Sequence, residues 1–305
     1  MEERSIVIVG GGPAGLTAGI YAARVGLRPL LIERGALGGK VRFTERLENF
    51  PGFSMGVEGH RLIAEMEGQA RRFGVEFTTA DIFEVKPIDE HLEVVGNGLR
   101  IRAEAVIVAT GTGPRPLGVP GEERLRGKGV SYCALSDASL FRHREVAVVG
   151  GGDSAVKEAL FLARYADRVY VIHRRDTLRA AQVLQEAAMA EPKITFVWDS
   201  VVTEVLGSDW VEGVKVKNLK TGEEDCLEVS GLVVFIGNQP NSGLVGQIVE
   251  LDPHGFILTN EEMRTSHPRI LAAGDVRRKR LRDAVTAVAD GALAATVAHG
   301  IIRHR

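Results

Sequence analysis

The sequence predicts an α/β protein of two domains, one inserted into the other. A glycine-rich motif near the N-terminus, IVIVGGGPAGL, returns 140 residues later as VAVVGGGDSAV. Each copy follows a run of β-branched apolar residues and precedes a segment with helical periodicity. Two Gly/Pro-rich segments, VIVATGTGPRP and VVFIGNQPN, match each other at an offset of 126 residues. Strand, glycine turn, helix and strand therefore occur twice, which is typical of βαβ units in an α/β fold.

The first glycine motif predicts a dinucleotide site. Gly10, Gly12 and Gly15 have the spacing of a Rossmann-like turn. The first glycine makes a tight turn, the second lets the backbone approach a pyrophosphate, and the third lets helix and strand pack closely. The pyrophosphate then lies at the positive N-terminus of the helix. Glu33 ends the next strand, 18 residues after Gly15, where a carboxylate accepts hydrogen bonds from ribose hydroxyls.

The second motif predicts a different nucleotide. The glycine spacing recurs at Gly150, Gly152 and Ala155. The offset that leads from Gly15 to Glu33 leads here to His173, so the carboxylate is absent. Two arginines follow at once, Arg174 and Arg175, and Arg179 lies one helical turn further. Guanidinium groups bind a 2′-phosphate through charge-assisted hydrogen bonds, which a carboxylate would repel. We therefore expect this site to select NADPH.

The matching Gly/Pro-rich segments predict where the chain crosses between domains. Gly111 and Pro114 correspond to Gly237 and Pro240. We expect a discontinuous first domain, residues 1–114 and 242–305, with residues 115–241 inserted as the second domain. The last part contains AAGDV, which places Asp275 at a strand end facing the first ligand. A helix is expected from residue 283 onward, with its N-terminus directed at the same ligand.

Composition narrows the class of protein. The 305 residues carry a net charge of -2, which argues against a general nucleic-acid binder. No apolar run is expected to span a membrane and no leader precedes the first strand, so we expect a cytoplasmic protein. The two cysteines, 93 residues apart, fit a reducing compartment. The eight histidines show no metal-ligand spacing, so no metal site is assigned.

These motifs resemble the low-molecular-weight thioredoxin reductase-like flavoproteins, which belong to the two-dinucleotide pyridine nucleotide-disulfide oxidoreductases. The resemblance covers essentially the whole chain and includes GGGPAGL, ENFPGF, ATG, AAGD, GGGDSA and HRRDTLR. It implies two Rossmann-like domains of the three-layer ββα type, the NADPH domain being inserted into the FAD domain. It also implies FAD as prosthetic group, NADPH as electron donor, a homodimer, and rotation of one domain relative to the other.

The resemblance also assigns two sets of binding residues. The FAD contacts it implies are Gly10, Gly12, Pro13, Ala14, Gly15, Glu33, Arg34, Gly39, Lys40, Asn49, Thr110, Gly111, Gly274, Asp275, Arg282, Asp283 and Ala284. The NADPH contacts it implies are Gly150, Gly152, Asp153, Ser154, Ala155, His173, Arg174, Arg175, Arg179, Ile236 and Gly237.

The segment GVSYCALSDA departs from the family at its redox centre. Family members carry two cysteines there as CxxC, whereas this chain has Cys133 followed by Ser136. A serine hydroxyl cannot form a disulfide or leave as a low-pKa thiolate. Asp137, which matches the proton-donating carboxylate of the family, is present. Cys226, the other cysteine, is interpreted as structural.

A second departure lies beside the expected flavin. The family usually has arginine followed by glutamine, and this chain has Arg282 and Asp283. An ionised aspartate would disfavour negative charge on the reduced flavin, so we hypothesise a lowered flavin potential. The basic run from Arg277 to Arg282 is interpreted as a solvated loop, with docking of an acidic redox partner as the functional alternative.

Three functions are compatible with these residues. The first is an NADPH-dependent flavin oxidoreductase whose FAD passes electrons directly to a ferredoxin, a flavodoxin, a quinone or a small dye-like acceptor. The second is a thioredoxin or other disulfide reductase that uses Cys133 as a monothiol. The third is a flavoprotein without turnover that senses NADPH. The first is preferred because both nucleotide motifs are intact and the second cysteine is replaced.

Overall fold

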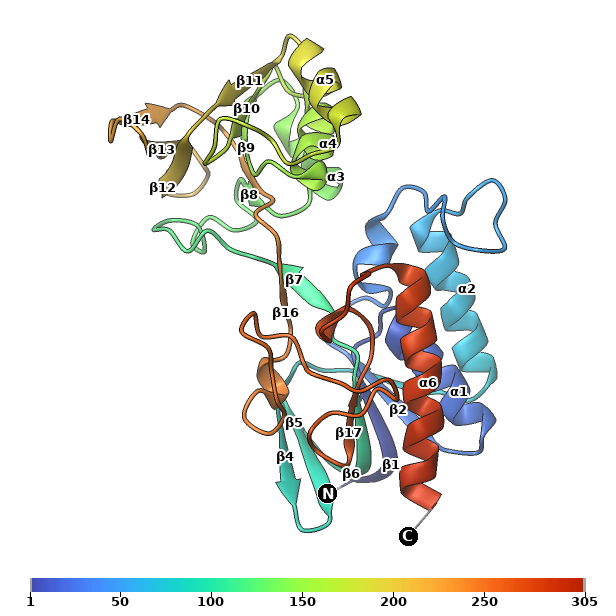
Figure 1. Ribbon diagram of the computed structural model, residues 1–305. Coiled ribbons are helices and arrows are strands. Elements are labelled where there is room, and N and C mark those ends of the chain that lie inside the picture. Colours follow the sequence, from blue (N-terminus) through green and yellow to red (C-terminus); the bar gives the residue numbers. More distant parts are fainter. Residues whose placement is uncertain (1, 304–305) are drawn as a thin grey trace. The chain divides into compact units, whose positions relative to one another are not determined.

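The computed structural model describes residues 2–303, apart from the side chains of Leu135 and Ser136 (Figure 1). The chain forms two compact units, Met1–Gly113 with Gln239–Arg305 as unit 1, and Pro114–Asn238 as unit 2. Two short strands, β7 (Thr112–Pro114) and β16 (Asn238–Pro240), pair with each other where the chain passes from one unit to the other. The domain limits expected from the sequence, 114 and 242, lie at the end of β7 and just beyond β16.

Unit 1 is built on a sheet in which one strand pairs with different neighbours along its length. Its parallel strands run in the order β3, β2, β1, β6 and β17: Glu76–Thr79, Pro29–Glu33, Glu2–Val9, Leu99–Val108 and Ile270–Ala272. The first half of β6 pairs in antiparallel fashion with β5 (His91–Gly96). Strand β5 in turn forms a hairpin with β4 (Ile82–Ile88). The second half of β6, from Val106, pairs with β17. One strand therefore serves both the parallel sheet and a three-stranded antiparallel layer.

Side chains alternate between two buried layers along β1. Ile6 and Ile8 belong to a core shared with the helices, α1 (Pro13–Arg24), α2 (Gly59–Arg72) and α6 (Ala284–Arg303). Val7 and Val9 belong to a second core with residues of β4 and β5. The period of two along a strand explains this division, because successive side chains point to opposite faces. The helices thus cover one face and the antiparallel layer covers the other, which confirms the predicted three-layer ββα class. Three short 3₁₀ helices complete unit 1: η1 (Gly39–Phe43), η3 (Gly243–Val245) and η4 (Gly274–Val276).

Helix α6 is the one helix of the described residues that is long and apolar enough, by length and composition only, to cross a membrane. An 18-residue window of it has a mean hydropathy of 1.5, although no membrane-spanning run was expected from the sequence. In the fold this helix packs closely against α1. A Cβ added to Gly291 would lie only 2.1 Å from the Ala14 carbonyl oxygen. It also carries Asp290, a buried carboxylate in two ion pairs. About 33% of the apolar window is buried, so part of the apolar composition of α6 serves packing within unit 1.

Unit 2 repeats the three-layer arrangement. Its parallel strands run in the order β11, β10, β9, β15 and β8: Ile194–Val197, Arg168–Ile172, Glu145–Val149, Leu232–Val234 and Val130–Ser131. One face packs in a core with α4 (Asp153–Ala163), and the short elements α3 (Ala134–Asp137), η2 (Ala138–Phe141) and α5 (Gln182–Ala190) join it. The other face packs against an antiparallel sheet of β12 (Ser200–Leu206), β13 (Gly213–Asn218) and β14 (Glu224–Leu227). The duplicated motif in the sequence thus corresponds to a duplicated architecture.

Candidate functional site

The glycine turn of unit 1 brings β1 close to α1. Gly10 has a φ of +110°, and a Cβ there would lie 2.4 Å from the carbonyl oxygen of Ala109. A Cβ on Gly15 would lie 1.8 Å from the carbonyl oxygen of Gly10. A Cβ on Gly12, the N-cap residue of α1, would have no neighbouring heavy atom within 4 Å. The outer two glycines therefore permit close packing, whereas Gly12 leaves the N-terminus of α1 open to a ligand.

Glu33 is held beside this turn at the end of β2. Its Oε2 accepts a hydrogen bond from the Gly11 amide at 2.7 Å, and its Oε1 accepts one from the Gly35 amide at 3.2 Å. Two backbone donors orient the carboxylate, and each oxygen retains a second lone pair for another donor. The half-buried carboxylate is therefore placed to accept hydrogen bonds from ribose hydroxyls.

A cleft of about 610 Å³, counting the part open to solvent, begins at this turn. It collects thirteen of the seventeen FAD contacts implied by the sequence: Gly10, Gly12, Pro13, Ala14, Glu33, Gly39, Lys40, Thr110, Gly111, Gly274, Asp275, Asp283 and Ala284. Four further residues that were not expected from the sequence also line the cleft, namely Val41, Ala109, Thr112 and Ala287. All four are neighbours of a motif residue or lie one helical turn from one, which is the signal that would have found them.

Four of the expected FAD contacts lie elsewhere. Gly15 is buried in the packing between α1 and the turn, and Arg34 is exposed. Asn49 is exposed in the loop before α2, where its Nδ2 donates to Asp283 Oδ2 at 2.9 Å. Arg282 is exposed, with its guanidinium carbon 3.9 Å from the centre of the Phe256 ring. These residues surround the cleft without lining it in this structure.

Asp275 carries an acceptor that the described part of the protein leaves unused. This half-buried carboxylate follows Gly274 in η4 and lines the cleft. Its Oδ1 is buried, and no donor among the described residues reaches it. Burial raises the pKa of Asp275, and the cations of Lys279, Lys40 and Arg282 oppose that rise. A buried acceptor without a donor is costly, so this atom fits a ligand that brings hydroxyl donors, as the ribityl chain of FAD does.

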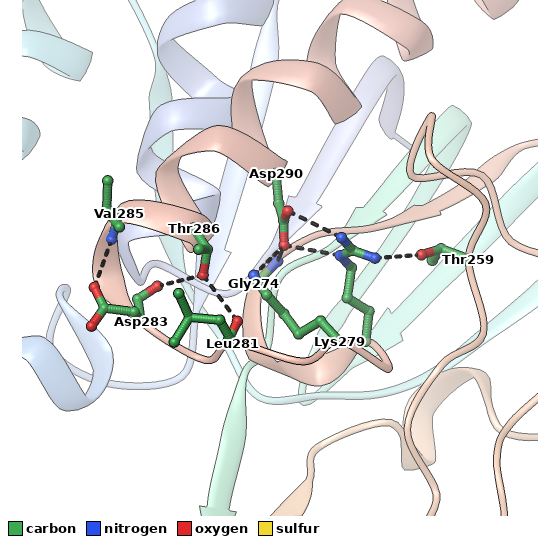
Figure 2. A network of polar contacts seen from close by, with 9 residues as sticks. Thr259, Gly274, Lys279, Leu281, Asp283, Val285, Thr286 and Asp290 are labelled. Carbon is green, nitrogen blue, oxygen red and sulfur yellow. Dashed lines mark hydrogen bonds and ion pairs between the residues drawn. The ribbon is translucent and has the colours of Figure 1, made fainter.

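Asp283 has a structural role that the sequence did not indicate. Its Oδ1 accepts a hydrogen bond from the Val285 amide at 3.1 Å, in the first turn of α6 (Figure 2). Its Oδ2 accepts the hydrogen bond from Asn49. The Asp283 backbone oxygen accepts a hydrogen bond from Thr286 Oγ1 at 3.0 Å. Asp283 is therefore an N-cap of the helix whose first turn lines the cleft, and it ties that turn to the loop containing Asn49.

The basic run after Asp275 is not one exposed cluster. Arg277 and Lys279 turn inward to Asp290, with only 15% and 7% of their side chains exposed (Figure 2). Arg278 and Arg280 are exposed, as is Arg282. The interpretation of the whole run as a solvated loop is therefore wrong for two of its residues. Their buried partner lies in the next helix, so the local sequence did not reveal it.

The glycine turn of unit 2 has the same geometry and a different side chain at the strand end. Gly150 has a φ of +149°, and a Cβ there would lie 2.4 Å from the Phe235 carbonyl oxygen. A Cβ on Gly152, the N-cap residue of α4, would have no neighbouring heavy atom within 4 Å. The His173 ring packs on Gly151, where an added Cβ would lie 2.4 Å from the ring. His173 is buried, its Nε2 has no partner among the described residues, and burial lowers its pKa.

The arginine segment of unit 2 is held against the turn by its backbone. The Arg179 amide donates to the Gly151 oxygen at 2.7 Å, and the Ala181 amide donates to Asp153 Oδ1 at 2.8 Å. Arg174, Arg175 and Arg179 are exposed, and no carboxylate within residues 2–303 pairs with them. Ser154 is exposed in the first turn of α4, and Ala155 is buried behind it. Three cations without a partner beside an open helix N-terminus fit a nucleotide that carries a 2′-phosphate.

The two remaining NADPH residues implied by the sequence follow strand β15. Ile236 is half-buried, and Gly237 is exposed with a φ of +112°. Strand β15 pairs with β9, which leads into the glycine turn, so both residues leave the sheet at the same edge as that turn.

The segment containing Cys133 has an organising residue that the sequence analysis missed. Ser131 is buried at the end of β8, and its Oγ lies 2.5 Å from Asp137 Oδ2, to which it donates. The same oxygen accepts a hydrogen bond from the Cys133 amide at 3.0 Å. Cys133 is half-buried at the N-cap position of α3. The side chain of Ser136, the third predicted catalytic position, lies outside the described residues. Ser131 thus ties the thiol-bearing residue to the acid.

Two Rossmann-like units, one with an oriented carboxylate at a strand end and one with an arginine segment, are typical of a two-dinucleotide oxidoreductase. The family model for pyridine nucleotide-disulphide oxidoreductases matches residues 4–291. Thioredoxin reductases of Listeria monocytogenes and Streptomyces coelicolor are each 45% identical, over 96% of this chain and 92% of their own. The chain belongs to the pyridine nucleotide-disulphide oxidoreductase family and is thioredoxin reductase-like. Members of that group use FAD and NADPH, and the two sites described above fit these cofactors.

Solved structures give the same assignment. Thioredoxin reductase from Lactococcus lactis is 40% identical, with a TM-score of 0.88, over 98% of this chain and 99% of its own. The enzyme from T. acidophilum is 30% identical, with a TM-score of 0.84, over 98% and 99% of the two chains.

Proposed function

We propose that this protein is an NADPH-dependent FAD oxidoreductase that passes electrons from FAD to an acceptor without an internal CxxC dithiol. The observation that carries the proposal is the sequence Cys133-Ala-Leu-Ser136 in the segment where the family has its cysteine pair. The only other thiol in the sequence, Cys226, is exposed in β14. Bound FAD supplies the two-electron chemistry, taking a hydride from NADPH and giving the electrons to the acceptor.

The residues of unit 1 bind and orient the flavin nucleotide in this proposal. The open N-terminus of α1 at Gly12 receives the pyrophosphate, and Glu33 accepts hydrogen bonds from a ribose. Asp275 accepts hydrogen bonds from the ribityl hydroxyls through its unused oxygen. The first turn of α6, capped by Asp283, lines the cleft with Ala284 and Ala287.

The residues of unit 2 select the electron donor. Arg174, Arg175 and Arg179 bind the 2′-phosphate of NADPH, which NADH lacks. The backbone contacts of the arginine segment with Gly151 and Asp153 hold that segment beside the pyrophosphate position.

The acceptor must take electrons from the flavin by a route other than a dithiol. A disulfide needs two sulfurs, and a serine hydroxyl at position 136 supplies neither the second sulfur nor a thiolate. A ferredoxin, a flavodoxin, a quinone or a small dye-like molecule would satisfy this requirement. The exposed guanidinium groups of Arg278, Arg280 and Arg282, in the segment between the cleft residues Asp275 and Asp283, favour an acidic partner among these.

A disulfide reductase is the second candidate, and the geometry around Cys133 favours it. Cys133 and Asp137 are both tied to Ser131, as expected if a thiol and an acid act together. In that reaction the Cys133 thiolate attacks a substrate disulfide, forms a mixed disulfide and releases one substrate thiolate. Two electrons, which bound FAD would supply, must then cleave the mixed disulfide, regenerate the Cys133 thiolate and release the second substrate thiolate, because the sequence has no partner cysteine near Cys133.

An anaerobic titration distinguishes these functions. The purified flavoprotein is titrated with NADPH and then with NADH, and flavin absorbance reports reduction. We expect NADPH to reduce the flavin and NADH to do so poorly. A panel of acceptors, including thioredoxin, is then tested with Cys133→Ser and the matched control Cys226→Ser. Acceptor reduction that survives Cys133→Ser supports the proposal.

Three outcomes would contradict the preferred function. Reduction of thioredoxin at a normal enzymatic rate without added thiols would refute our interpretation of Ser136. Loss of disulfide-dependent NADPH oxidation in Cys133→Ser but not in Cys226→Ser would establish the monothiol reductase. Failure of NADPH to reduce the flavin would leave a nucleotide sensor without turnover.

We further propose a cytoplasmic homodimer. Both properties come from the resemblance to the family, and sedimentation of the flavoprotein tests the second. A single species with the mass of one chain at all concentrations would contradict it.

A further inference from the structure

We propose that Asp290 is a positioning residue for the FAD site, which fixes the turn at Gly274 and thereby keeps Asp275 directed into the cleft. This inference rests on the assignment of FAD to unit 1. Asp290 is not among the described residues that line the cleft, so any effect on the cofactor must pass through other residues.

The Asp290 carboxylate collects four hydrogen bonds inside unit 1 (Figure 2). Its Oδ2 accepts bonds from the Gly274 amide at 3.0 Å, Arg277 Nε at 2.9 Å and Lys279 Nζ at 2.7 Å. Its Oδ1 accepts a bond from Arg277 Nη2 at 3.3 Å. Asp290 is only 7% exposed, so these bonds are shielded from water. One side chain of α6 therefore holds a backbone group and two side chains of the preceding loop.

The turn at Gly274 needs such a partner. The preceding residue, Ala273, still donates its amide to the Val108 oxygen in the sheet. Gly274 leaves the sheet with a φ of +78°, and its buried amide donates to Asp290. A Cβ on Gly274 would lie 3.0 Å from the Ala14 Cβ, so the turn also packs against α1. Without Asp290 the amide would be buried and unpaired, and the turn would lose its contact with α6.

Asp275 lies in the sequence between two residues that hydrogen-bond to Asp290, namely Gly274 and Arg277. On one side is the Gly274 amide, and on the other is the Arg277 side chain, which also donates to Thr259 Oγ1 at 2.8 Å. The Arg277 amide closes the turn by donating to the Gly274 oxygen at 3.3 Å. The backbone of Asp275 is therefore fixed from both directions. Its free Oδ1 is held where a ligand donor can reach it, and small displacements of such groups weaken ligand binding strongly.

The charges of the cluster support the same role. Two nearly buried cations, Arg277 and Lys279, surround one carboxylate. The excess positive charge lies next to Asp275, where Lys279 opposes the effect of burial and favours the ionised carboxylate. An ionised acceptor makes the stronger hydrogen bond to a hydroxyl. Asp290 thus sets the position of Asp275 and holds Lys279, whose cation favours the ionised carboxylate, while the charge of Asp290 itself raises the pKa of Asp275.

The test compares the affinity of the apoprotein for FAD with its affinity for ADP. ADP contains the parts of FAD that contact the glycine turn and Glu33, but it has no ribityl chain. The variant Asp290→Asn keeps the size of the side chain and removes its charge. We expect Asp290→Asn to weaken FAD binding by about tenfold and ADP binding by less than about twofold. In an Asp275→Asn background, Asp290→Asn should change FAD affinity by less than about twofold, because the group it positions is gone.

Two results would overturn the proposal. The first is equal weakening of FAD and ADP by Asp290→Asn, which would indicate general damage to unit 1. The second is an unchanged effect of Asp290→Asn in the Asp275→Asn background, which would show that the two residues act independently.

A second variant covers the case in which Asp290→Asn does not fold, since it leaves two buried cations without a counter-charge. The double variant Asp290→Asn/Lys279→Met has the same net charge in the cluster as the original protein. It is compared with Lys279→Met alone, which keeps the bond from Gly274 to Asp290. We expect only the double variant to lose FAD affinity relative to ADP. Equal FAD affinity in these two variants would also refute the proposal.

Discussion

Replacing Gly15 with alanine tests whether the first glycine turn holds FAD. An added Cβ would lie 1.8 Å from the Gly10 carbonyl oxygen, and real Cβ atoms essentially never approach a heavy atom closer than 3.0 Å. The gap between α1 and the turn must therefore open by more than 1 Å. Helix α1 has little room to move, because Gly291 of α6 lies directly against the Ala14 carbonyl. Overpacking of this kind costs about 1–3 kcal/mol.

We expect this displacement to change the affinity for FAD more than it changes the free energy of unfolding. The same shift moves the N-terminus of α1 away from the pyrophosphate, and each 1.4 kcal/mol lost from binding is about a tenfold loss of affinity. We therefore expect Gly15→Ala to be purified with less FAD, and its apoprotein to bind added FAD at least about tenfold more weakly. Flavin absorbance per chain and a fluorescence titration with FAD measure these quantities.

Unit 2 supplies the matched control for this experiment. Ala155 occupies the position of Gly15 and is fully buried, so α4 already accommodates a methyl group there. Ala155→Gly should cost about 1 kcal/mol of helix stability and leave FAD content unchanged. Full FAD content and unchanged affinity in Gly15→Ala would refute the reasoning that this glycine is required for close packing.

Burial raises the pKa of Asp275 from 3.8, so its contribution to stability is present in acid and is lost as pH rises. Asp275→Asn should therefore raise the melting temperature of the apoprotein near neutral pH by about 2 °C or more and weaken FAD binding, as thermal scans and FAD titrations will show. Burial lowers the pKa of His173 from 6.5, so stability should fall as pH drops below 6.5. Thermal unfolding of His173→Gln should depend less steeply on pH in that range. Arg174→Ala and Arg179→Ala should each weaken NADPH binding by about tenfold and leave NADH binding unchanged, and equal loss for both nucleotides would contradict the assignment.

The sequence revealed the parts of the site that are encoded within a few consecutive residues. The turn at Gly10 and the acid at Glu33 follow from a motif and a fixed offset, because strand, turn and helix are local structures. The direction of a charged side chain is decided by distant residues. Lys279 appears in a run of basic residues typical of a surface loop, yet Asp290, eleven residues later, draws it into the interior.

The same limit explains the other residues that were missed or misread. Asp283 was interpreted by its charge, although its backbone position at the start of α6 makes it a cap. Ser131 carries no motif of its own, and its importance appears only when β8 and α3 are placed together. The apolar composition of α6 is ambiguous in the sequence, because a helix packed between others and a membrane helix need the same residues.

Unit 2 is inserted at a place where the two segments of unit 1 already bind each other, so the molecule can be divided there. The two segments of unit 1 meet at Thr110 and Asn241, where the Thr110 hydroxyl donates to the Asn241 oxygen at 2.7 Å and Asn241 Nδ2 donates back to the Thr110 oxygen at 2.9 Å. These bonds, with the one from the Asn241 amide to the Gly111 oxygen, lie within unit 1 and need nothing from unit 2. A short linker from residue 113 to residue 239 would therefore close unit 1 at little entropic cost. The two nucleotide-binding halves are in this sense separable modules, which laboratory recombination could exchange between relatives as whole units.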